Sequence, residues 1–542
     1  MYISSLSIRN YRTFQNVTFS FDSRVNYIVG DNNIGKSNLL RLLKGITHGE
    51  GFKERDFLDA DEPIEVLMSL SSENKKSDDT LHLKLVQKVQ EVVPRLFDKD
   101  SGKQLPLEYM RCLFYMDVGL FEVPRNLLHD ALADEIIQIF EHCFSETSTS
   151  VQDVEKLLAL RGFPVHFSEG HPKQCALELF RAIFGTPSQC SSAYHTTTGL
   201  MIAIGAVLLA KMKEKKESRA ISFENMVTLD EKGRRFLSMM VSIDEPELHL
   251  HPYLQRALLS YIRSILNNEE PFFLHLVQSV LGVDGLDGQL FVVTHSTDSL
   301  VNDYRQIIRM YWDEKRMVQA ACGVSFHFNS EIEKHLIMHF PEVKEALYSR
   351  CTILVEGETE YGSFGYFART LGVHLDYHGI CLINARGESS IAKIAQLIRR
   401  FHIPVVGLYD RDVIDSHQKR KDIFYTDYIC YEMDVVKACL AARSRKVLDQ
   451  VIEEIVETGD TVSSALIKKA GAKLGIPKGF YPPKKLKNIN PRDEQALEFY
   501  YFAWLYGNKG VIIGRALGTH LTEKEIPPAF AKAIQAAVEL AK

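Results

Sequence analysis

The sequence lacks a hydrophobic run long enough to cross a bilayer, and its first residues show no signal-peptide pattern. It also lacks any C-x-x-C pair, and its nine cysteines are scattered without regular spacing. These absences argue against a membrane protein and a secreted disulfide scaffold. They predict a cytoplasmic protein with reduced, mostly buried thiols and no membrane partner.

The chain also lacks a large net charge of either sign, because it has 64 basic and 70 acidic residues and a net charge of −6. This balance disfavours an all-over basic nucleic-acid-binding surface but allows a local basic groove. No long heptad arm divides the chain, which argues against a long-armed coiled-coil machine. The 542 residues, 45% of them hydrophobic, suffice for several globular domains.

A phosphate-binding loop is the clearest motif that is present. Residues 30–37 spell G-x-x-x-x-G-K-S, after an apolar run at 27–29 and before a helical segment at 38–43. In this strand–loop–helix context, backbone N–H groups cradle phosphates, the lysine reaches the β- and γ-phosphates, and the serine holds Mg²⁺. The residues predicted to bind ATP here are Gly30, Asn33, Gly35, Lys36 and Ser37.

Two later strands end in polar residues that suit ATP hydrolysis. The apolar run at 236–243 leads into Asp244 and Glu245, and a second run at 290–293 is followed by His295. Asp244 is predicted to hold Mg²⁺ through water, and Glu245 to orient the attacking water. His295 is predicted to sense the γ-phosphate.

Two further candidates are less specific. Arg12 follows the strand predicted for Tyr2 to Ile8, at a sheet edge, and fits a surface charge and a nucleotide contact equally well. Thr198 and Gly199 open an apolar helix, where a hydroxyl and a glycine can bind an anion. An ordinary N-cap at Thr198 explains the same residues and is the better local explanation. Helical periodicity also predicts an insertion at about 120–190.

The order of these elements resembles the ABC-type ATPase heads of the RecF, structural-maintenance-of-chromosomes and Rad-fifty kind, over residues 1–345. The resemblance implies two heads that sandwich two ATP molecules, hence self-association as a dimer or tetramer, with the insertion as a candidate dimerisation element. It gives Thr198 and Gly199 the signature role, although the usual Leu-Ser-Gly-Gly wording is absent. It gives His295 the switch role and Arg12 a nucleotide contact.

The second half repeats strand and helix patterns, which predicts a parallel sheet. Strands at 352–355 and 404–409 run into Glu356 and into Asp410 and Asp412. Sites gather at the carboxyl ends of such strands, so these acids should converge. Packed carboxylates repel one another unless they bind protons or cations, and their oxygens favour Mg²⁺ or Mn²⁺.

Other acids extend this predicted metal site. Glu360 lies in the first turns of the next helix, and Glu432 and Asp434 begin a later one. They could add a second cation, and two ions roughly 4 Å apart would clamp the attacking and leaving oxygens of a phosphodiester. A helix cap or a surface charge remains a serious alternative for Glu360, Glu432 and Asp434.

The pair Glu356–Gly357 followed by Asp410-x-Asp412 resembles the Toprim domain, expected at 346–542 with C-terminal helices. An ABC-type head followed by Toprim is similar to the OLD (overcoming lysogenization defect) family of ATP-linked nucleases, which includes the Gabija nuclease. The resemblance implies an ATP-regulated DNA endonuclease or nickase that uses Mg²⁺, with Mn²⁺ or Ca²⁺ as substitutes. It implies bacterial anti-phage defence, with a partner protein or nucleic acid, and a cleavage-assisting lysine that best matches Lys509. A solvated turn lysine explains Lys509 nearly as well.

Two alternatives stay open. A non-cutting, ATP-dependent DNA-binding or sensor protein would use the acids for structural Mg²⁺, and a DNA-relaxing enzyme would need a nucleophilic tyrosine. For any of them, the basic and aromatic stretch at 478–487 is the best candidate DNA-contacting loop.

Overall fold

The computed structural model describes residues 1–72, 80–117, 130–145, 150–160, 163–168, 171–184, 197–218, 223–248, 250–300, 303–416, 420–455 and 459–542. They form two compact units, Met1–Phe326 and His327–Lys542. The sequence analysis set the division at 345/346. The structure sets it earlier because helix α9 (Ser330–Ala346) packs against α11 (Glu388–Arg400) of the second unit. Glu331 of α9 also pairs with Lys393 of α11 at 3.1 Å.

The first unit begins with an antiparallel sheet in the order β2-β1-β4-β5-β6-β7. Its strands are β1 (Tyr2–Tyr11), β2 (Phe14–Ser20), β4 (Ile64–Ser71), β5 (Leu81–Gln87), β6 (Arg95–Asp98) and β7 (Gln104–Leu105). The prediction of an edge position for the first strand is wrong, because β1 pairs with β2 on one side and with β4 on the other.

A mostly parallel sheet forms the centre of the same unit, in the order β13-β12-β3-β11-β10-β8, with β9 paired to β10. Its strands are β3 (Val25–Gly30), β8 (Phe114–Asp117), β9 (Val227–Leu229), β10 (Arg235–Asp244), β11 (Gly285–Val293), β12 (Ile307–Trp312) and β13 (Val318–Cys322). Every residue of β3 and β11 is buried. Such continuously buried strands are typical of parallel sheets covered on both faces.

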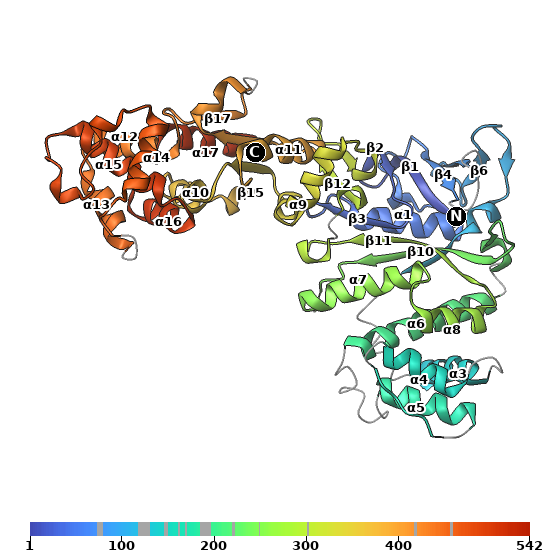
Figure 1. Ribbon diagram of the computed structural model, residues 1–542. Coiled ribbons are helices and arrows are strands. Elements are labelled where there is room, and N and C mark those ends of the chain that lie inside the picture. Colours follow the sequence, from blue (N-terminus) through green and yellow to red (C-terminus); the bar gives the residue numbers. More distant parts are fainter. Residues whose placement is uncertain are drawn as a thin grey trace. The chain divides into compact units, whose positions relative to one another are not determined.

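Helices cover this sheet and extend away from it (Figure 1). Next to the sheet lie α1 (Lys36–His48), α7 (Pro252–Leu266) and α8 (Pro271–Leu281), and α6 (Thr197–Glu217) packs on α7 and α8. The predicted helical insertion is confirmed in its described part as α3 (Asp130–Ser145), α4 (Val151–Leu160) and α5 (Pro172–Phe184). Helix α3 packs on α5, α6 and α8, α5 also packs on α6, and α4 packs on α8.

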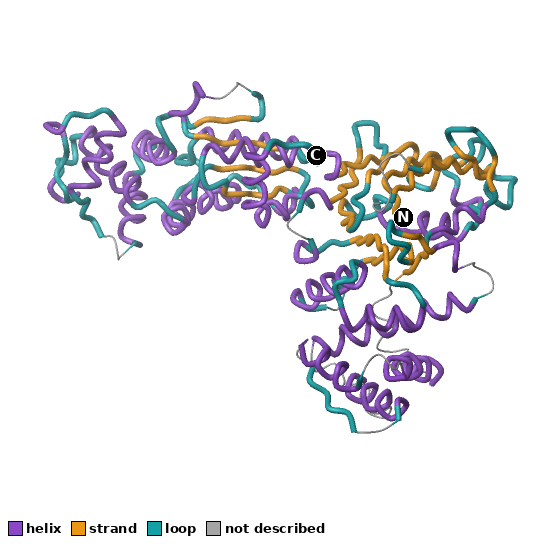
Figure 2. Tube along the Cα trace, turned by 45° about the vertical axis from the view of Figure 1, so that its right-hand side comes forward, coloured by secondary structure: helices purple, strands orange, loops and turns teal. Residues whose placement is uncertain are grey.

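The second unit holds the predicted parallel sheet, in the order β15-β14-β16-β17. Its strands are β14 (Cys351–Val355), β15 (Ile380–Asn384), β16 (Val405–Tyr409) and β17 (Ile423–Tyr425). Helices flank the strands on both sides in Figure 2, with α9 and α11 on one face and α10 (Glu358–Thr370) and α17 (Pro528–Leu540) on the other. The fold is therefore mixed α/β, with an antiparallel and a mostly parallel sheet in the first unit and a parallel sheet in the second.

The remaining helices of the second unit are α12 (Tyr431–Ala441), α13 (Arg445–Glu454), α14 (Ser464–Leu474), α15 (Glu494–Gly507) and α16 (Val511–His520). Helix α15 is the centre of their packing, because eight of its residues are buried, among them Tyr500, Tyr501 and Trp504. Helix α16 packs along α10, which fixes the turn between α15 and α16 beside the sheet. In the part of the chain that the structure describes, no helix combines the length and apolar character needed to span a membrane.

Candidate functional site

The phosphate-binding loop runs from the end of β3 to the start of α1, and two of its glycines are sterically required. Gly30 has φ +144°, and a Cβ there would lie 2.4 Å from the carbonyl oxygen of Met310. Gly35 has φ +107°, and its Cβ would lie 2.3 Å from Oγ1 of Thr13. Both the left-handed φ and the close approach exclude a side chain at these positions. The backbone can therefore come close to a bound phosphate.

Lys36 is buried at the start of α1, and its Nζ donates to the carbonyl oxygens of Gly30 at 2.9 Å and Asp31 at 2.8 Å. Burial lowers the pKa of Lys36, while nearby carboxylates, including Asp244 and Glu245, act in the opposite direction. The lysine is thus folded over the loop and faces the predicted acids. Ser37 follows it in α1, and Asn33 lies at the exposed tip of the loop with φ +62°.

The acid pair and the histidine meet at the ends of neighbouring strands. β10 ends at Asp244, and Glu245 continues with φ +52° while its N–H donates to the carbonyl of Val293 at 2.8 Å. Nε2 of His295 lies 3.8 Å from Oε1 of Glu245. Glu247, which the sequence analysis did not select, accepts a hydrogen bond from Thr294 Oγ1 at 2.8 Å and so fixes the histidine loop.

Arg12 is held beside the first turn of α1. Its guanidinium pairs with Asp56 at 2.7 Å and donates to Asn38 Oδ1 at 3.2 Å. Arg12 lines a cavity of about 630 Å³ together with Asn38, Arg41 and Arg55. The nucleotide contact of Arg12 stays a prediction, and the cavity adds Arg41 and Arg55, for which the sequence offered no motif.

Thr198 and Gly199 lie in the first turn of α6, and the surroundings of the Thr198 side chain fall outside the described residues. Their signature role therefore stays a prediction.

In the second unit, two predicted acids come together at the carboxyl ends of adjacent strands. Glu356 follows β14 and Asp410 follows β16, and the N–H of Asp410 approaches Oε2 of Glu356 at 3.5 Å. Asp410 Oδ1 accepts a hydrogen bond from the N–H of Tyr431 at 2.9 Å. Both acids line a cavity of about 300 Å³, whose other charged residues include Glu360 and Lys509.

Two more carboxylates lie close to this cavity. Glu360 projects from α10, and Glu432, in the first turn of α12, is fully buried. Lys509 Nζ lies 2.9 Å from Glu432 Oε1. Apart from this ion pair, neither oxygen of Glu432 has a hydrogen-bond partner among the described residues. A buried carboxylate with unused lone pairs fits a site that takes up a cation.

The acids raise one another's pKa because they share a water-poor site. Burial, with Glu360, Glu432 and Glu356 adding to it, raises the pKa of Asp410 to about 8. Burial and Glu432 raise the pKa of Glu360 to about 7, and burial raises that of Glu356. Burial lowers the pKa of Lys509, but Glu432 and Asp410 outweigh it and the net pKa is raised.

Asp410 and Glu360 therefore keep protons closer to neutral pH than ordinary carboxyls do, and a divalent cation would replace those protons. Among the described residues, no three His, Cys, Asp or Glu side chains already surround a common metal position. Binding a cation here requires deprotonation and an inward turn of the side chains.

The two other predicted ligands make separate contacts. Asp412, in the short helix η8 (Arg411–Ser416), forms an ion pair with Lys473 of α14. Asp434 accepts hydrogen bonds from the backbone N–H groups of Asp427 at 2.9 Å and Tyr428 at 2.7 Å. The oxygens of Asp434 thus hold the loop before α12. This is a structural role, in contrast to the predicted role as a metal ligand.

Sequence reasoning missed Lys473, which had no motif around it. It also missed Tyr506, whose ring lies under two ammonium groups, Lys509 at 4.7 Å and Lys469 at 5.1 Å. In the predicted DNA-contacting loop, Tyr481 stacks on Phe499 at 5.6 Å. That ring is used for packing and is not presented for base stacking.

Three family models match parts of the chain. Residues 347–412 match the TOPRIM domain of overcoming lysogenization defect protein-like proteins. Residues 1–92 match the AAA ATPase domain, and residues 230–302 match the AAA domain of the putative AbiEii toxin, Type IV TA system.

Among curated proteins, the Old nuclease of Escherichia phage P2 is 21% identical over 509 residues, which cover 78% of this chain and 80% of that protein. The DNA replication and repair protein RecF of Flavobacterium johnsoniae is 36% identical over 52 residues, 10% of this chain and 14% of RecF.

Two solved structures have a partial likeness to this chain. The C-terminal region of the Burkholderia pseudomallei OLD protein is 20% identical and covers 36% of this chain and all of its own, with a TM-score of 0.24. The SMC head domain of Thermotoga maritima is 14% identical and covers 59% of this chain and 98% of its own, with a TM-score of 0.32. The fold assignment rests on the strand orders described above. This chain joins AAA-type ATPase segments to an OLD-like Toprim domain and is similar to the Old nuclease along most of its length.

Proposed function

We propose that the protein is an ATP-regulated, divalent-metal-dependent DNA endonuclease or nickase that acts in the cytoplasm of a bacterium in anti-phage defence. The observation that carries the proposal is the carboxylate cavity of the second unit. Glu356, Glu360 and Asp410 face one cavity with Lys509, and Glu432 is buried beside them. Acids whose pKa values are raised by their crowding form a strong site for hard cations.

In this proposal, bound Mg²⁺, or Mn²⁺ or Ca²⁺ as a substitute, supplies Lewis acidity at the scissile phosphodiester. Glu356, Glu360, Asp410 and Asp412 are the proposed ligands, with Glu432 as a candidate for a second ion. Lys509 places its ammonium at the scissile phosphate or the leaving oxygen. Glu432 keeps that ammonium in the cavity, since the two lie 2.9 Å apart.

The proposed role of Lys473 follows from its ion pair with Asp412. The Lys473 ammonium lies beside the Asp412 carboxylate, where it neutralises the charge that a divalent cation would otherwise neutralise. If Asp412 held a cation, Lys473 would be free at the edge of the site. There it can contact a phosphate of the DNA backbone.

The first unit is proposed to bind ATP with the loop residues Gly30, Asn33, Gly35, Lys36 and Ser37. Asp244 holds Mg²⁺ through water, Glu245 orients the attacking water, and His295, 3.8 Å from Glu245, reports the γ-phosphate. Thr198 and Gly199 of a second copy would close the site, so that two heads associate as a dimer or tetramer. The nucleotide would then control how two heads dock and thereby the access of DNA.

The relatives of the chain support this proposal. The relative that matches 78% of the chain is a nuclease, and the RecF relative that matches 10% of it is a DNA replication and repair protein. Defence, with a partner protein or nucleic acid, follows from the family resemblance.

The decisive experiment incubates supercoiled plasmid with Mg²⁺ or Mn²⁺ and compares the wild-type protein with Glu356→Ala and Asp410→Ala. We expect nicked or linear plasmid with the wild type and a loss of roughly 100-fold or more in both variants, because each removes a metal-holding carboxylate. Thermal unfolding of each variant, measured in EDTA, serves as the folding control.

Two other results would replace the proposal. Relaxed plasmid with covalent protein–DNA adducts would indicate a strand-passing enzyme with a tyrosine nucleophile. DNA binding by folded, ATP-hydrolysing protein without any metal-dependent cutting would indicate a DNA-binding or sensor protein.

A further inference from the structure

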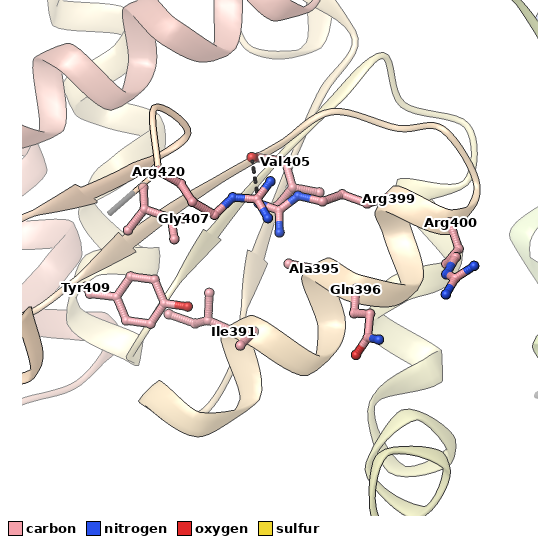
Figure 3. A pocket seen from close by; sticks show the side chains of 11 residues that line it. Ile391, Ala395, Gln396, Arg399, Arg400, Val405, Gly407, Tyr409 and Arg420 are labelled. Carbon is pink, nitrogen blue, oxygen red and sulfur yellow. Dashed lines mark hydrogen bonds between the residues drawn. The ribbon is translucent and has the colours of Figure 1, made fainter. Parts of the chain in front are cut away.

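A second cavity of the Toprim unit, of about 480 Å³, lies between α11 and the strands β16 and β17 (Figure 3). It belongs to neither site described above. Its volume falls within the roughly 300–1,000 Å³ typical of small-molecule sites.

The topology explains why this face of the sheet is hollow. Right-handed crossovers place the β16–β17 connection on the same face as α11, where an α-helix normally covers the edge strand. In its described residues, 410–416 and 420–422, the connection contains only the short helix η8. The residues that face the gap are also small, because Gly407 of β16 and Ala392 and Ala395 of α11 line the cavity.

Two guanidinium groups are held in this cavity by one carboxylate. Arg399 Nη2 donates to Asp422 Oδ2 at 2.6 Å and to the carbonyl of Val405 at 3.4 Å. Arg420 donates to Asp422 from Nε at 3.0 Å and from Nη2 at 3.1 Å. The two groups lie next to each other in Figure 3. Each guanidinium has five N–H donors, so both can bind a further acceptor.

The charge around this pair favours an anion with two negative charges. Three arginines line the cavity, namely Arg399, Arg400 and Arg420. Among the described residues that pair with them, the one negative charge is that of Asp422. Guanidinium groups in a fixed arrangement match the oxygens of a phosphate better than those of a smaller anion. A phosphate monoester carries close to two charges at neutral pH, whereas a backbone phosphodiester carries one.

The rest of the wall is apolar or aromatic. Ile391, Val405 and Ile423 line it, together with the ring of Tyr409, and Gln396 adds an amide. A flat ring that packs on this wall while its phosphate meets the arginines would use both parts of the cavity.

We propose that this cavity binds a nucleotide through a terminal phosphate monoester. The ligand is either a free nucleotide or the 5′-phosphorylated end of a DNA strand. This site goes beyond the proposed nuclease function and does not depend on it. Tyr409 lines the cavity and immediately precedes Asp410, so the ligand would contact the strand that carries a proposed metal ligand.

The test uses the full-length Lys36→Ala protein in EDTA, which removes ATP-loop binding and metal-bridged binding. Calorimetry compares AMP with adenosine, and a 5′-phosphorylated oligonucleotide with its 5′-hydroxyl counterpart. We expect the phosphorylated member of at least one pair to bind about tenfold more tightly or better. Preference within the AMP pair alone identifies a free nucleotide, and preference within the oligonucleotide pair alone identifies a DNA end.

Three variants locate the binding. Arg420→Gln should weaken it about tenfold, and Ala395→Phe should abolish it by filling the cavity while the Asp422 ion pairs remain. Arg369→Gln, at the end of α10 and outside the cavity, is the matched control and should bind as the parent does. Equal affinity for the members of both pairs, absence of binding by the folded protein, or unchanged affinity in Ala395→Phe would overturn the proposal.

Discussion

The two candidate sites are built on opposite principles. The nucleotide loop is made by backbone, from eight consecutive residues in which Gly30 and Gly35 clear space and Lys36 bonds to loop carbonyls. The Toprim cavity is made by side chains that are far apart in the sequence, from Glu356 to Lys509. A site made by backbone tolerates little change in its glycines. It brings few charged side chains close together. A side-chain site concentrates charge, so its state depends on protons and cations.

The largest effect is expected from Lys36→Ala, which tests whether the two sites work separately. We expect ATP turnover to fall by roughly 100-fold or more, because the lysine is the side chain that reaches the phosphates. Mn²⁺ binding by the Toprim acids, measured by calorimetry, should not change. Turnover equal to that of the wild type would show that the loop does not bind ATP as proposed. A parallel loss of Mn²⁺ binding would show that the two sites are not separate.

The complementary change is Lys509→Met, which removes the counter-ion of the fully buried Glu432. We expect plasmid cleavage to fall roughly 100-fold while ATP turnover stays within about twofold. Stability in EDTA should also fall, by about 1–3 kcal/mol, since a buried carboxylate loses a partner that is itself partly exposed. Lys524→Met, at an exposed position, is the control. Unchanged cleavage would show that Lys509 takes no part in cleavage and is only a surface charge.

The pH dependence of stability sharpens the contrast between the sites. In the folded protein the pKa of Asp410 is about 8 and that of Glu360 about 7, both above their ordinary values. Between about pH 4 and pH 8 the folded state therefore holds protons that the unfolded chain has released. Stability in EDTA should fall as the pH rises through this window.

Mn²⁺ should reverse that loss, because the cation binds the deprotonated acids. We expect Mn²⁺ to raise the Tm by several degrees at pH 8 and by much less at pH 5, as followed by calorimetry. In Asp410→Asn the slope of stability against pH should flatten. An equal Mn²⁺ effect at both pH values would contradict the crowded-carboxylate explanation.

The smallest expected effect belongs to Lys473→Met. If this lysine occupies the cation's position beside Asp412, its removal should raise the affinity for Mn²⁺ a few-fold. It should also weaken DNA binding and reduce the slope of log K against log[salt] by about one. Lys468→Met, on the same helix and exposed, should change neither quantity. A lower Mn²⁺ affinity in Lys473→Met would show that the lysine merely supports the structure.

The sequence predicted those parts of the fold whose signals are local. Strands β14 and β16 follow from short apolar runs, so the predicted bounds 352–355 and 404–409 agree with the structure to within one residue. The interior position of β1, between β2 and β4, could not be derived. A strand's neighbours are decided by segments far away in the chain, here by β4 more than fifty residues later.

The same division applies to the Toprim site. Glu356 and Asp410 were predictable because each directly follows a buried strand of one parallel sheet. The ion pair of Asp412 with Lys473 was not predictable, since α14 is positioned by its packing on α15. Asp434 shows the limit most clearly. Its place in the sequence is that of a ligand, but its oxygens accept hydrogen bonds from the loop at 427–428.

By itself, the sequence determined the phosphate loop, the order of an ATPase head before a Toprim sheet, and the acids at the strand ends. Each of these depends on contiguous residues, whose backbone preferences and hydrophobic periods are local. The tertiary structure decided which acids share a cavity, which ammonium groups neutralise them, and where Arg399 and Arg420 meet Asp422. Those contacts join segments far apart in the chain, and only the packing of the folded core brings such segments together.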